Sequence, residues 1–179
     1  MRLLGFGIPL LTFLLVPDPA TAQSFLVQGA AGLTAVDRGY SLAAGVGLSL
    51  NPWVTVLGDL ERTHLETRIG SNERGGGSAF RGGTVTYGSA EVRVSLLGRT
   101  RVSPYVLGGF AAGVSRPTVN ERYPDSGTNN VRATFFGGGI QVPVRERLTM
   151  FADGRVLLGA ESGETLALAP IRFGIGWRF

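Results

Sequence analysis

From Ser24 onward, apolar residues recur at every second position, and this period constrains the fold more than any other feature of the sequence. Successive side chains of an extended strand point to opposite faces, whereas the apolar face of a helix repeats about every 3.6 residues. The alternation forms eight strand-like segments, at residues 24–35, 40–50, 53–63, 83–97, 103–115, 131–144, 148–158 and 167–179. The sequence therefore predicts an all-β protein.

The links between these segments alternate in length. The second, fourth and sixth links are tight, at 51–52, 98–102 and 145–147, whereas two of the others are long, at 64–82 and 116–130. Up-and-down antiparallel strands put odd and even links at opposite ends of a barrel. Outer-membrane barrels have short turns at one end and long loops at the other, and their strands need about 9–11 residues to cross the bilayer. We therefore expect a closed eight-stranded antiparallel up-and-down transmembrane β-barrel.

The first 22 residues have the features of a secretory signal peptide. Arg2 precedes an uncharged, mostly apolar stretch at 3–16, and Ala20-Thr21-Ala22 provides an Ala-x-Ala cleavage site. The apolar stretch is shorter than the roughly 20 residues of a membrane-spanning helix, and no other apolar run approaches that length. We expect residues 1–22 to be a cleaved signal peptide and residues 23–179 to form the barrel in a bacterial outer membrane.

Composition excludes several classes of protein. The absence of cysteine rules out disulfides, thiolate metal sites and a lipid-modified cysteine. The net charge of +4 comes from arginines that are scattered singly, so nucleic-acid binding is not expected. The sequence predicts no cofactor and no metal.

Each segment has a charge-free face and a face that carries the polar residues. In 53–63, for example, Val56 and Leu60 oppose Asp59 and Glu61. A soluble barrel would turn its apolar face inward around a hydrophobic ligand, and alternation alone leaves that alternative open. The export signal, the strand lengths, the unequal links and the small residues on the polar face favour an apolar face turned to lipid. The register of 103–115 and 131–144, which are rich in Gly and Ala, stays ambiguous.

The polar faces predict a charged interior. An eight-stranded barrel leaves an interior only wide enough for side chains, and buried charges are tolerated when they are paired. We therefore expect a plugged lumen with little or no conductance. The predicted ion-pair network has four acids and four bases, namely Asp59, Glu61, Glu91, Arg93, Asp153, Arg155, Arg172 and Arg178.

The eight-strand plan, the segment PYVLGGFAAG at 104–113 and the final residues RFGIGWRF resemble the OmpA-like and OmpX-like small outer-membrane β-barrels. The resemblance covers the whole mature chain and implies its fold and location. In that family the alternating last strand is recognised by the barrel-assembly machinery after delivery by periplasmic chaperones. The resemblance implies that an assembly signal is formed by Phe173, Gly174, Trp177 and Phe179, and that removing Phe179 impairs insertion.

A lipid-modifying enzyme is the main alternative to a structural or surface-interaction protein acting through its outer loops. Resemblance to the lipid A deacylase or palmitoyltransferase would require a histidine near a serine and an acid. The single histidine is His64, but Glu66 stands where a His-x-Ser motif has its serine. A nucleophile would have to come from elsewhere, such as Ser71 or Ser78. We therefore expect a non-enzymatic protein.

The loop end of the barrel also carries candidate lipid contacts. Outer-membrane lipids are the expected partners, and lipopolysaccharide phosphates are suitable acceptors for arginine, although solvated loop charges explain these residues equally well. The arginines are Arg68, Arg74, Arg81, Arg116 and Arg122. The aromatic residues Tyr40, Trp53, Tyr105 and Trp177 fit girdle positions at the membrane surface.

Overall fold

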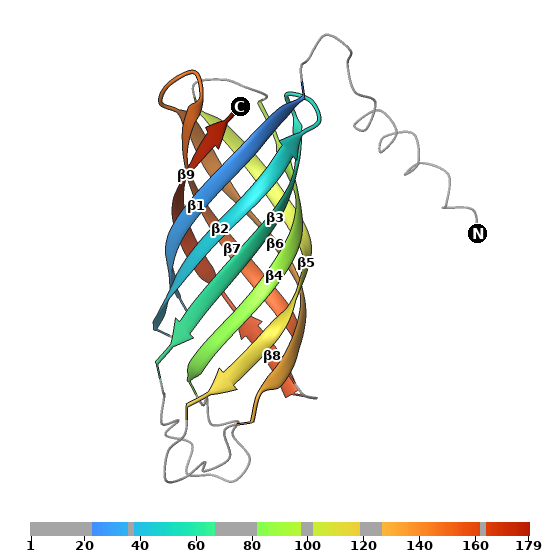
Figure 1. Cartoon of the computed structure of the whole chain (residues 1–179), viewed down its shortest axis with the longest axis vertical. Coiled ribbons are helices and arrows are strands. Elements are labelled where there is room, and N and C mark those ends of the chain that lie inside the picture. The colour runs from blue at the N-terminus through green and yellow to red at the C-terminus, as the bar shows by residue number, and fades with distance from the viewer. Residues whose placement is uncertain (1–22, 36–37, 67–81, 98–101, 119–126, 162–163) are drawn as a thin grey trace, which may run out of the picture.

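The computed structural model describes residues 23–35, 38–66, 82–97, 102–118, 127–161 and 164–179, and Figure 1 shows that they form a closed barrel of tilted strands. The predicted signal peptide lies outside the described residues. The strands are β1 (Ser24–Thr34), β2 (Gly39–Ser49), β3 (Val54–Leu65), β4 (Gly83–Ser95), β5 (Ser103–Pro117), β6 (Asn129–Pro143), β7 (Leu148–Glu161), β8 (Glu164–Leu168) and β9 (Pro170–Arg178).

From β1 to β7 each strand pairs antiparallel with the next one in sequence, β8 and β9 both pair with β7, and β9 closes the barrel against β1. β8 and β9 form one strand, because the register against β7 runs on from Leu157↔Leu168 to Gly154↔Ile171. The ladder is interrupted where Pro170 lacks a backbone N–H. The predicted fold, a closed eight-stranded antiparallel barrel, is confirmed. None of the described residues forms a helix long and apolar enough to span a membrane.

The two ends of the barrel differ. The short-turn rim carries the links 50–53, 96–102 and 144–147 together with both strand ends Ser24 and Phe179. Its first turn is fixed by Asn51, whose Oδ1 accepts the N–H groups of Trp53 at 2.8 Å and Val54 at 2.7 Å. The loop rim is formed where β1, β3, β5 and β7 end and where β2, β4, β6 and β8 begin. The alternation of short and long links is therefore present as predicted.

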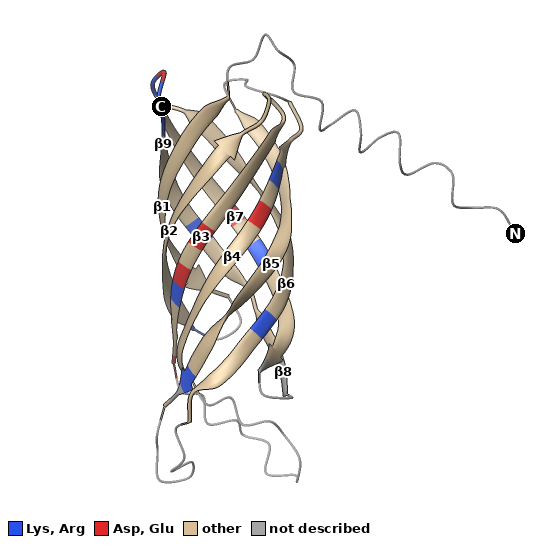
Figure 2. Ribbon diagram, turned by 45° about the vertical axis from the view of Figure 1, so that its right-hand side comes forward, with Lys and Arg blue, Asp and Glu red and all other residues tan. Residues whose placement is uncertain are grey.

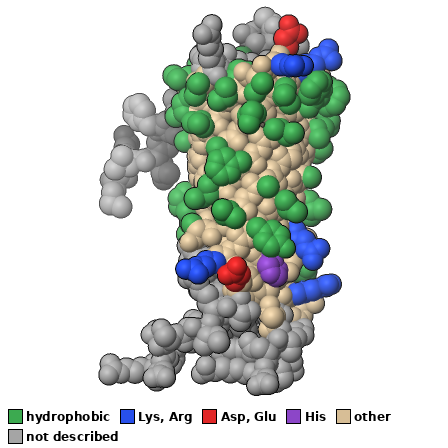
Figure 3. Space-filling model, turned by 90° about the vertical axis from the view of Figure 1, so that its left-hand side faces the viewer, with side chains coloured by type: hydrophobic (Ala, Val, Ile, Leu, Met, Phe, Trp, Pro, Cys, Tyr) green, Lys and Arg blue, Asp and Glu red, His purple; other side chains and the backbone are tan. Residues whose placement is uncertain are grey.

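The outer surface is an apolar band with charges at its edges (Figure 3). Phe110 is 72% exposed and Phe173 is 62% exposed, although both are large apolar side chains. Exposed charged residues lie near the ends of the strands: Arg38, Arg62, Glu66, Arg116 and Arg132 at the loop rim, and Arg145, Glu146 and Arg147 at the short-turn rim. The apolar faces are thus outside, which is the reverse of what a soluble barrel with a hydrophobic ligand requires.

The structure resolves the register of the two ambiguous strands and corrects one assignment. In β6, Phe135 is buried inside the barrel and Phe136 faces outward. In β5 the odd positions face inward, so Tyr105 is only 2% exposed. The expectation that Tyr105 belongs to a surface girdle is therefore wrong. Its ring lies inside because it shares a face with Leu107 and Ala111, while Phe110 takes the outward position.

The interior consists of three layers. Next to the short-turn rim lies a polar layer formed by Ser49, Ser95, Ser103, Gln141 and Thr149. The middle holds charged side chains that are buried, and Figure 2 shows where charged residues lie along the strands. Towards the loop rim the inward side chains include an apolar cluster, which we call the apolar plug, formed by Leu65, Val85, Val131, Ala133, Phe135, Leu157, Leu166 and Leu168. The buried polar residues Thr34, Ser41, Thr63 and Ser115 lie at the same end. The plug was not predicted, because the polar faces were expected to carry polar side chains along their whole length.

Candidate functional site

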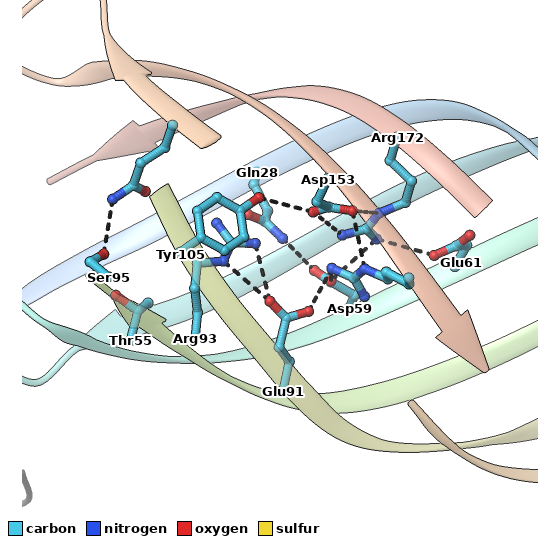
Figure 4. Close-up of polar contacts among 12 residues, drawn as sticks. Gln28, Thr55, Asp59, Glu61, Glu91, Arg93, Ser95, Tyr105, Asp153 and Arg172 are labelled. Carbon is cyan, nitrogen blue, oxygen red and sulfur yellow. Dashed lines mark hydrogen bonds and ion pairs between the residues drawn. The ribbon is translucent and has the colours of Figure 1, made fainter. Parts of the chain in front are cut away.

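Seven charged side chains meet inside the barrel, in what we call the charge cluster (Figure 4). Within β3, β4 and β7 they stand two positions apart, so both members of each pair point inward. The curvature of the barrel then brings β3 and β4 across from β7 and β9. The members are Asp59 and Glu61 of β3, Glu91 and Arg93 of β4, Asp153 and Arg155 of β7, and Arg172 of β9.

Arg172 is the centre of the charge cluster and has no solvent exposure. Its Nε and Nη2 donate to the two carboxylate oxygens of Asp153 at 2.9 and 3.0 Å. Its Nη1 donates to Glu61 Oε2 at 3.1 Å and lies 3.6 Å from Asp59 Oδ2. A two-pronged contact of this kind is stronger and more directional than a single hydrogen bond. Arg172 therefore ties β9 to β7 and to β3 across the lumen.

The other two arginines extend the cluster to β4. Arg155 Nη2 lies 2.6 Å from Glu91 Oε2, and its Nε donates to Asp153 Oδ1 at 3.2 Å. Arg93 donates to Glu91 Oε1 from Nε at 3.2 Å and from Nη2 at 3.1 Å. The Arg93 guanidinium also lies 4.4 Å from the centre of the Tyr105 ring. All four acids thus have an arginine within ion-pairing distance.

Two neutral side chains complete the cluster, and sequence reasoning missed both. Gln28 Nε2 donates to Asp59 Oδ1 at 2.8 Å, and the Tyr105 hydroxyl donates to Asp153 Oδ2 at 3.1 Å. Gln28 could have been found, because it is the long polar residue on the inward face of β1. Tyr105 gave no such signal, since the sequence did not fix which face of 103–115 points inward.

Arg178 lies apart from the other seven predicted members. It is six positions beyond Arg172 on β9, which corresponds to roughly 20 Å along a strand. It lines a cavity of about 500 Å³ at the short-turn rim, together with Gln141, Arg145, Arg147 and other residues. The charge cluster therefore holds four carboxylates and three guanidinium groups, rather than the balanced set expected from the sequence.

His64 faces outward from β3, where its ring centre lies 5.3 Å from that of Tyr40. Within the described part of the chain, no serine hydroxyl or carboxylate is hydrogen-bonded to it, and Ser71 and Ser78 lie outside that part. No group of three or more His, Asp or Glu side chains among the described residues is arranged to hold a metal ion. The described geometry provides no catalytic arrangement around His64.

The last strand has three aromatic residues on its outer face. Phe173, Trp177 and Phe179 are exposed, and the Phe179 ring centre lies 6.1 Å from that of Phe25 in β1. The Phe179 N–H donates to the Phe25 carbonyl at 2.9 Å. Gly174 points inward, where an added Cβ would collide with the Phe151 ring and the Gly29 carbonyl. Gly174 is therefore required for packing where β9 meets β1.

The closed barrel and its apolar exterior give the chain the fold of the small outer-membrane β-barrels. No family model matches the sequence, and no curated protein matches it significantly. Among solved structures, Neisserial surface protein A has a TM-score of 0.67 at 12% identity, covering 89% of this chain and all of that one. The N-terminal barrel of Pseudomonas aeruginosa OprF has a TM-score of 0.64 at 13% identity, covering 87% and 97%. Ail of Yersinia pestis has a TM-score of 0.54 at 16% identity, covering 88% of this chain and 98% of that one. At these identities the likeness shows the fold alone.

Proposed function

We propose that the protein is a non-enzymatic outer-membrane barrel with a sealed lumen, which acts as a structural or surface-interaction protein through the loop rim. The observation that carries the proposal is the combination of a closed barrel and an apolar exterior, on which the exposed charges of the described residues lie near the two rims. Soluble monomers rarely expose apolar patches larger than a few hundred Å². Closure also pairs the backbone groups that lipid could not hydrogen-bond.

The lumen is sealed by two successive barriers. Towards the loop rim the apolar plug fills the interior, and its members are at most 7% exposed. Behind the plug, the arginines and acids of the charge cluster span the barrel from β3 to β7 and β9. A water-filled pore would need space that these side chains occupy. Passive transport is therefore not the function we propose.

The loop rim faces the cell exterior in this proposal, because outer-membrane barrels carry their long loops outside. Its links 66–82 and 118–128 include four of the arginines suited to phosphate or sulfate ligands, and Arg116 lies near the end of β5. Ail, a neighbour by fold, is an attachment invasion locus protein and has a structure in complex with the heparin analogue sucrose octasulfate. This supports binding of an anionic partner, with lipopolysaccharide as the nearest one.

The location also implies the route of assembly. We propose that the chain is exported through residues 1–22, carried by periplasmic chaperones and inserted by the barrel-assembly machinery, as the likeness to OmpA-like and OmpX-like barrels suggests. The aromatic outer face of β9 supports this proposal, since Phe173, Trp177 and Phe179 are accessible on the strand that closes the barrel.

Cell fractionation followed by a gel tests the location. The protein should sediment with the outer membrane, and unboiled samples in detergent should migrate differently from boiled samples because a closed barrel stays folded. Recovery in the soluble fraction would refute the proposal. Deleting the gene should leave the composition of lipid A unchanged. A change in lipid A that the His64→Ala variant reproduces would establish the enzymatic alternative instead.

A further inference from the structure

We propose that the outward face of β2–β4 holds one phosphorylated lipid of the outer leaflet, with its phosphate on Arg62 and an acyl chain in the groove beside it. The inference rests on the proposed outer-membrane location and adds a specific site to it. The partner chemistry is that of lipid A, which presents phosphate groups directly above several acyl chains. The site is defined by a groove, by a row of donors and by a cation that has no carboxylate partner among the residues that the structure describes.

The groove is a shallow hollow of about 620 Å³ in the apolar band. Its floor is formed by small residues that face outward on three adjacent strands, Ala44 of β2, Gly58 of β3 and Gly88 of β4. The larger side chains Val46 and Leu60 project beside them. The register places these residues side by side, since Leu60 is paired with both Ala44 and Gly88. A hollow of about 620 Å³ in the apolar band has room for an acyl chain.

The donors lie directly beyond the groove on the same strands. Arg62 is two positions from Leu60, roughly 7 Å along β3, and it is paired with Leu42 and Thr86. The next row of outward-facing residues, closer to the loop rim, is formed by Tyr40, His64 and Thr84. Figure 3 shows the histidine beside charged side chains at the edge of the apolar band. Side chains that can donate to phosphate oxygens thus begin where the apolar surface ends.

The Arg62 charge is available to a ligand. None of the described carboxylates forms an ion pair with Arg62. The outward acid of the same strand is Glu66, four positions away, and its N–H donates to the Arg38 carbonyl at 3.2 Å. Glu66 therefore lies at the outer end of β3, beside Arg38 rather than beside the groove. A guanidinium group has a planar set of donors that matches phosphate oxygens in a two-pronged contact.

A second outward arginine provides a contrast. Arg132 of β6 is exposed near the same rim, but its paired neighbours are Ala112 and Ala160. Neither of these flanking residues carries a hydroxyl group, and none of the residues that line the groove belongs to β6. Arg132 contributes to the general positive charge of the loop rim without the local features of Arg62. It is therefore the matched control for electrostatic attraction that is not tied to one site.

The test measures binding of lipid A to the purified full-length barrel in detergent, by native mass spectrometry. The Arg62→Gln variant should bind about tenfold more weakly than the unchanged protein, the loss expected when one hydrogen bond to a charged group is removed. The Arg132→Gln variant should bind within about twofold of the unchanged protein. Lipid A from which both phosphates have been removed should bind equally to all three proteins.

The groove is tested with a matched pair of glycine variants. A Cβ at Gly58 would lie 3.8 Å from the nearest atom, the Ser89 carbonyl oxygen, so a side chain fits there. The Gly58→Leu variant should fold and lose lipid A binding, because leucine fills the groove. Gly154 of β7 also faces the apolar band and has nothing within 4 Å of an added Cβ. The Gly154→Leu variant should bind lipid A normally.

Two results would overturn the site. Equal losses in the Arg62→Gln and Arg132→Gln variants would mean that the rim attracts lipid A only through its overall charge. Unchanged binding by Gly58→Leu would mean that the groove does not hold the lipid. Each variant is first checked for outer-membrane recovery and for the difference between boiled and unboiled samples. A barrel that passes these checks but fails the binding test leaves the proposed function intact, whereas a protein absent from the membrane refutes both.

Discussion

At the scale of single residues, the charge cluster is the feature with the largest energetic consequence. Arg172 has no solvent exposure and contacts three acids, so its removal leaves several buried negative charges with fewer partners. Glu61 is different, because Arg172 retains Asp153 and Asp59 when Glu61 is neutralised. Since the cluster contains one more acid than base, neutralising an acid brings it closer to balance.

We expect the Arg172→Met variant to lower the free energy of unfolding by about 3–5 kcal/mol, the usual consequence of leaving a buried charge without its partner. The Glu61→Gln variant should cost about 1 kcal/mol, because an amide can still accept a hydrogen bond from Arg172. Urea unfolding in lipid vesicles, followed by the fluorescence of Trp53 and Trp177, measures both values. A larger loss for Glu61→Gln than for Arg172→Met would contradict the role assigned to Arg172.

Single glycines show equally local effects. A Cβ on Gly109 would point inward, against the Ala90 carbonyl oxygen and 2.8 Å from the Phe135 ring. We expect the Gly109→Ala variant to be destabilised by about 1–3 kcal/mol, as overpacked interiors are. The Gly154→Ala variant should stay within about 0.5 kcal/mol of the unchanged protein, because its Cβ meets open space. The same unfolding experiment compares them, and equal stabilities would show that the interior can relax around the extra methyl group.

At the scale of elements, the strand that closes the barrel is the most informative. β8 and β9 keep a single register against β7, although Pro170 interrupts the ladder between them. β1 pairs with β9 from Leu26↔Arg178 to Thr34↔Pro170, and at the short-turn rim Phe179 adds a backbone hydrogen bond and a ring contact to Phe25. Closure therefore depends on the final residues of the chain as well as on the strand interior.

We expect the Phe179→Ala variant to reduce the amount of folded barrel in the outer membrane severalfold. The Phe110→Ala variant, which removes an equally exposed phenylalanine from β5, should accumulate normally. Both substitutions remove a similar apolar surface. We expect a difference because only Phe179 belongs to the strand proposed as the assembly signal. Quantitative immunoblotting of outer-membrane fractions measures the yields. Similar losses in the two variants would argue against a special role of Phe179 in assembly.

At the scale of the whole molecule, the layered interior determines permeability. The cavity of about 500 Å³ at the short-turn rim opens onto the polar layer, and the charge cluster and the apolar plug follow behind it. A solute that enters from this rim meets first the paired charges and then the apolar plug. In the function proposed above, these layers close the barrel and leave a vestibule at one end.

We expect the purified protein to give no single-channel currents in planar bilayers at moderate voltage, because the proposed sealed lumen, formed by the charge cluster and the apolar plug, would provide no continuous path for water. A porin reconstituted in the same bilayers provides the positive control. Regular conductance steps that disappear when the protein is omitted would contradict the sealed interior, although they would leave the location in the membrane unaffected.

The sequence by itself determined the strand plan, the position of the turns and, for most strands, which side chains point inward and which point outward. It did so because a strand with one apolar face has a period of two, and a one-residue slip would expose every side chain on that face to the wrong environment. The inward position of Asp59, Glu91, Asp153 and Arg172 followed from this period. In the Gly- and Ala-rich strands the two faces differ little, so the burial of Tyr105 and Phe135 could not be read from the pattern.

Only the tertiary structure decided which inward side chains meet. Partners such as Arg172 and Glu61 are 111 positions apart in the chain, and their contact depends on the stagger and closure of the whole barrel. The same closure separates Arg178 from the charge cluster, groups the inward apolar residues into a plug and aligns Ala44, Gly58 and Gly88 into a groove. Local alternation fixes the side of the sheet on which a residue lies, whereas its height and its neighbours are properties of the closed barrel.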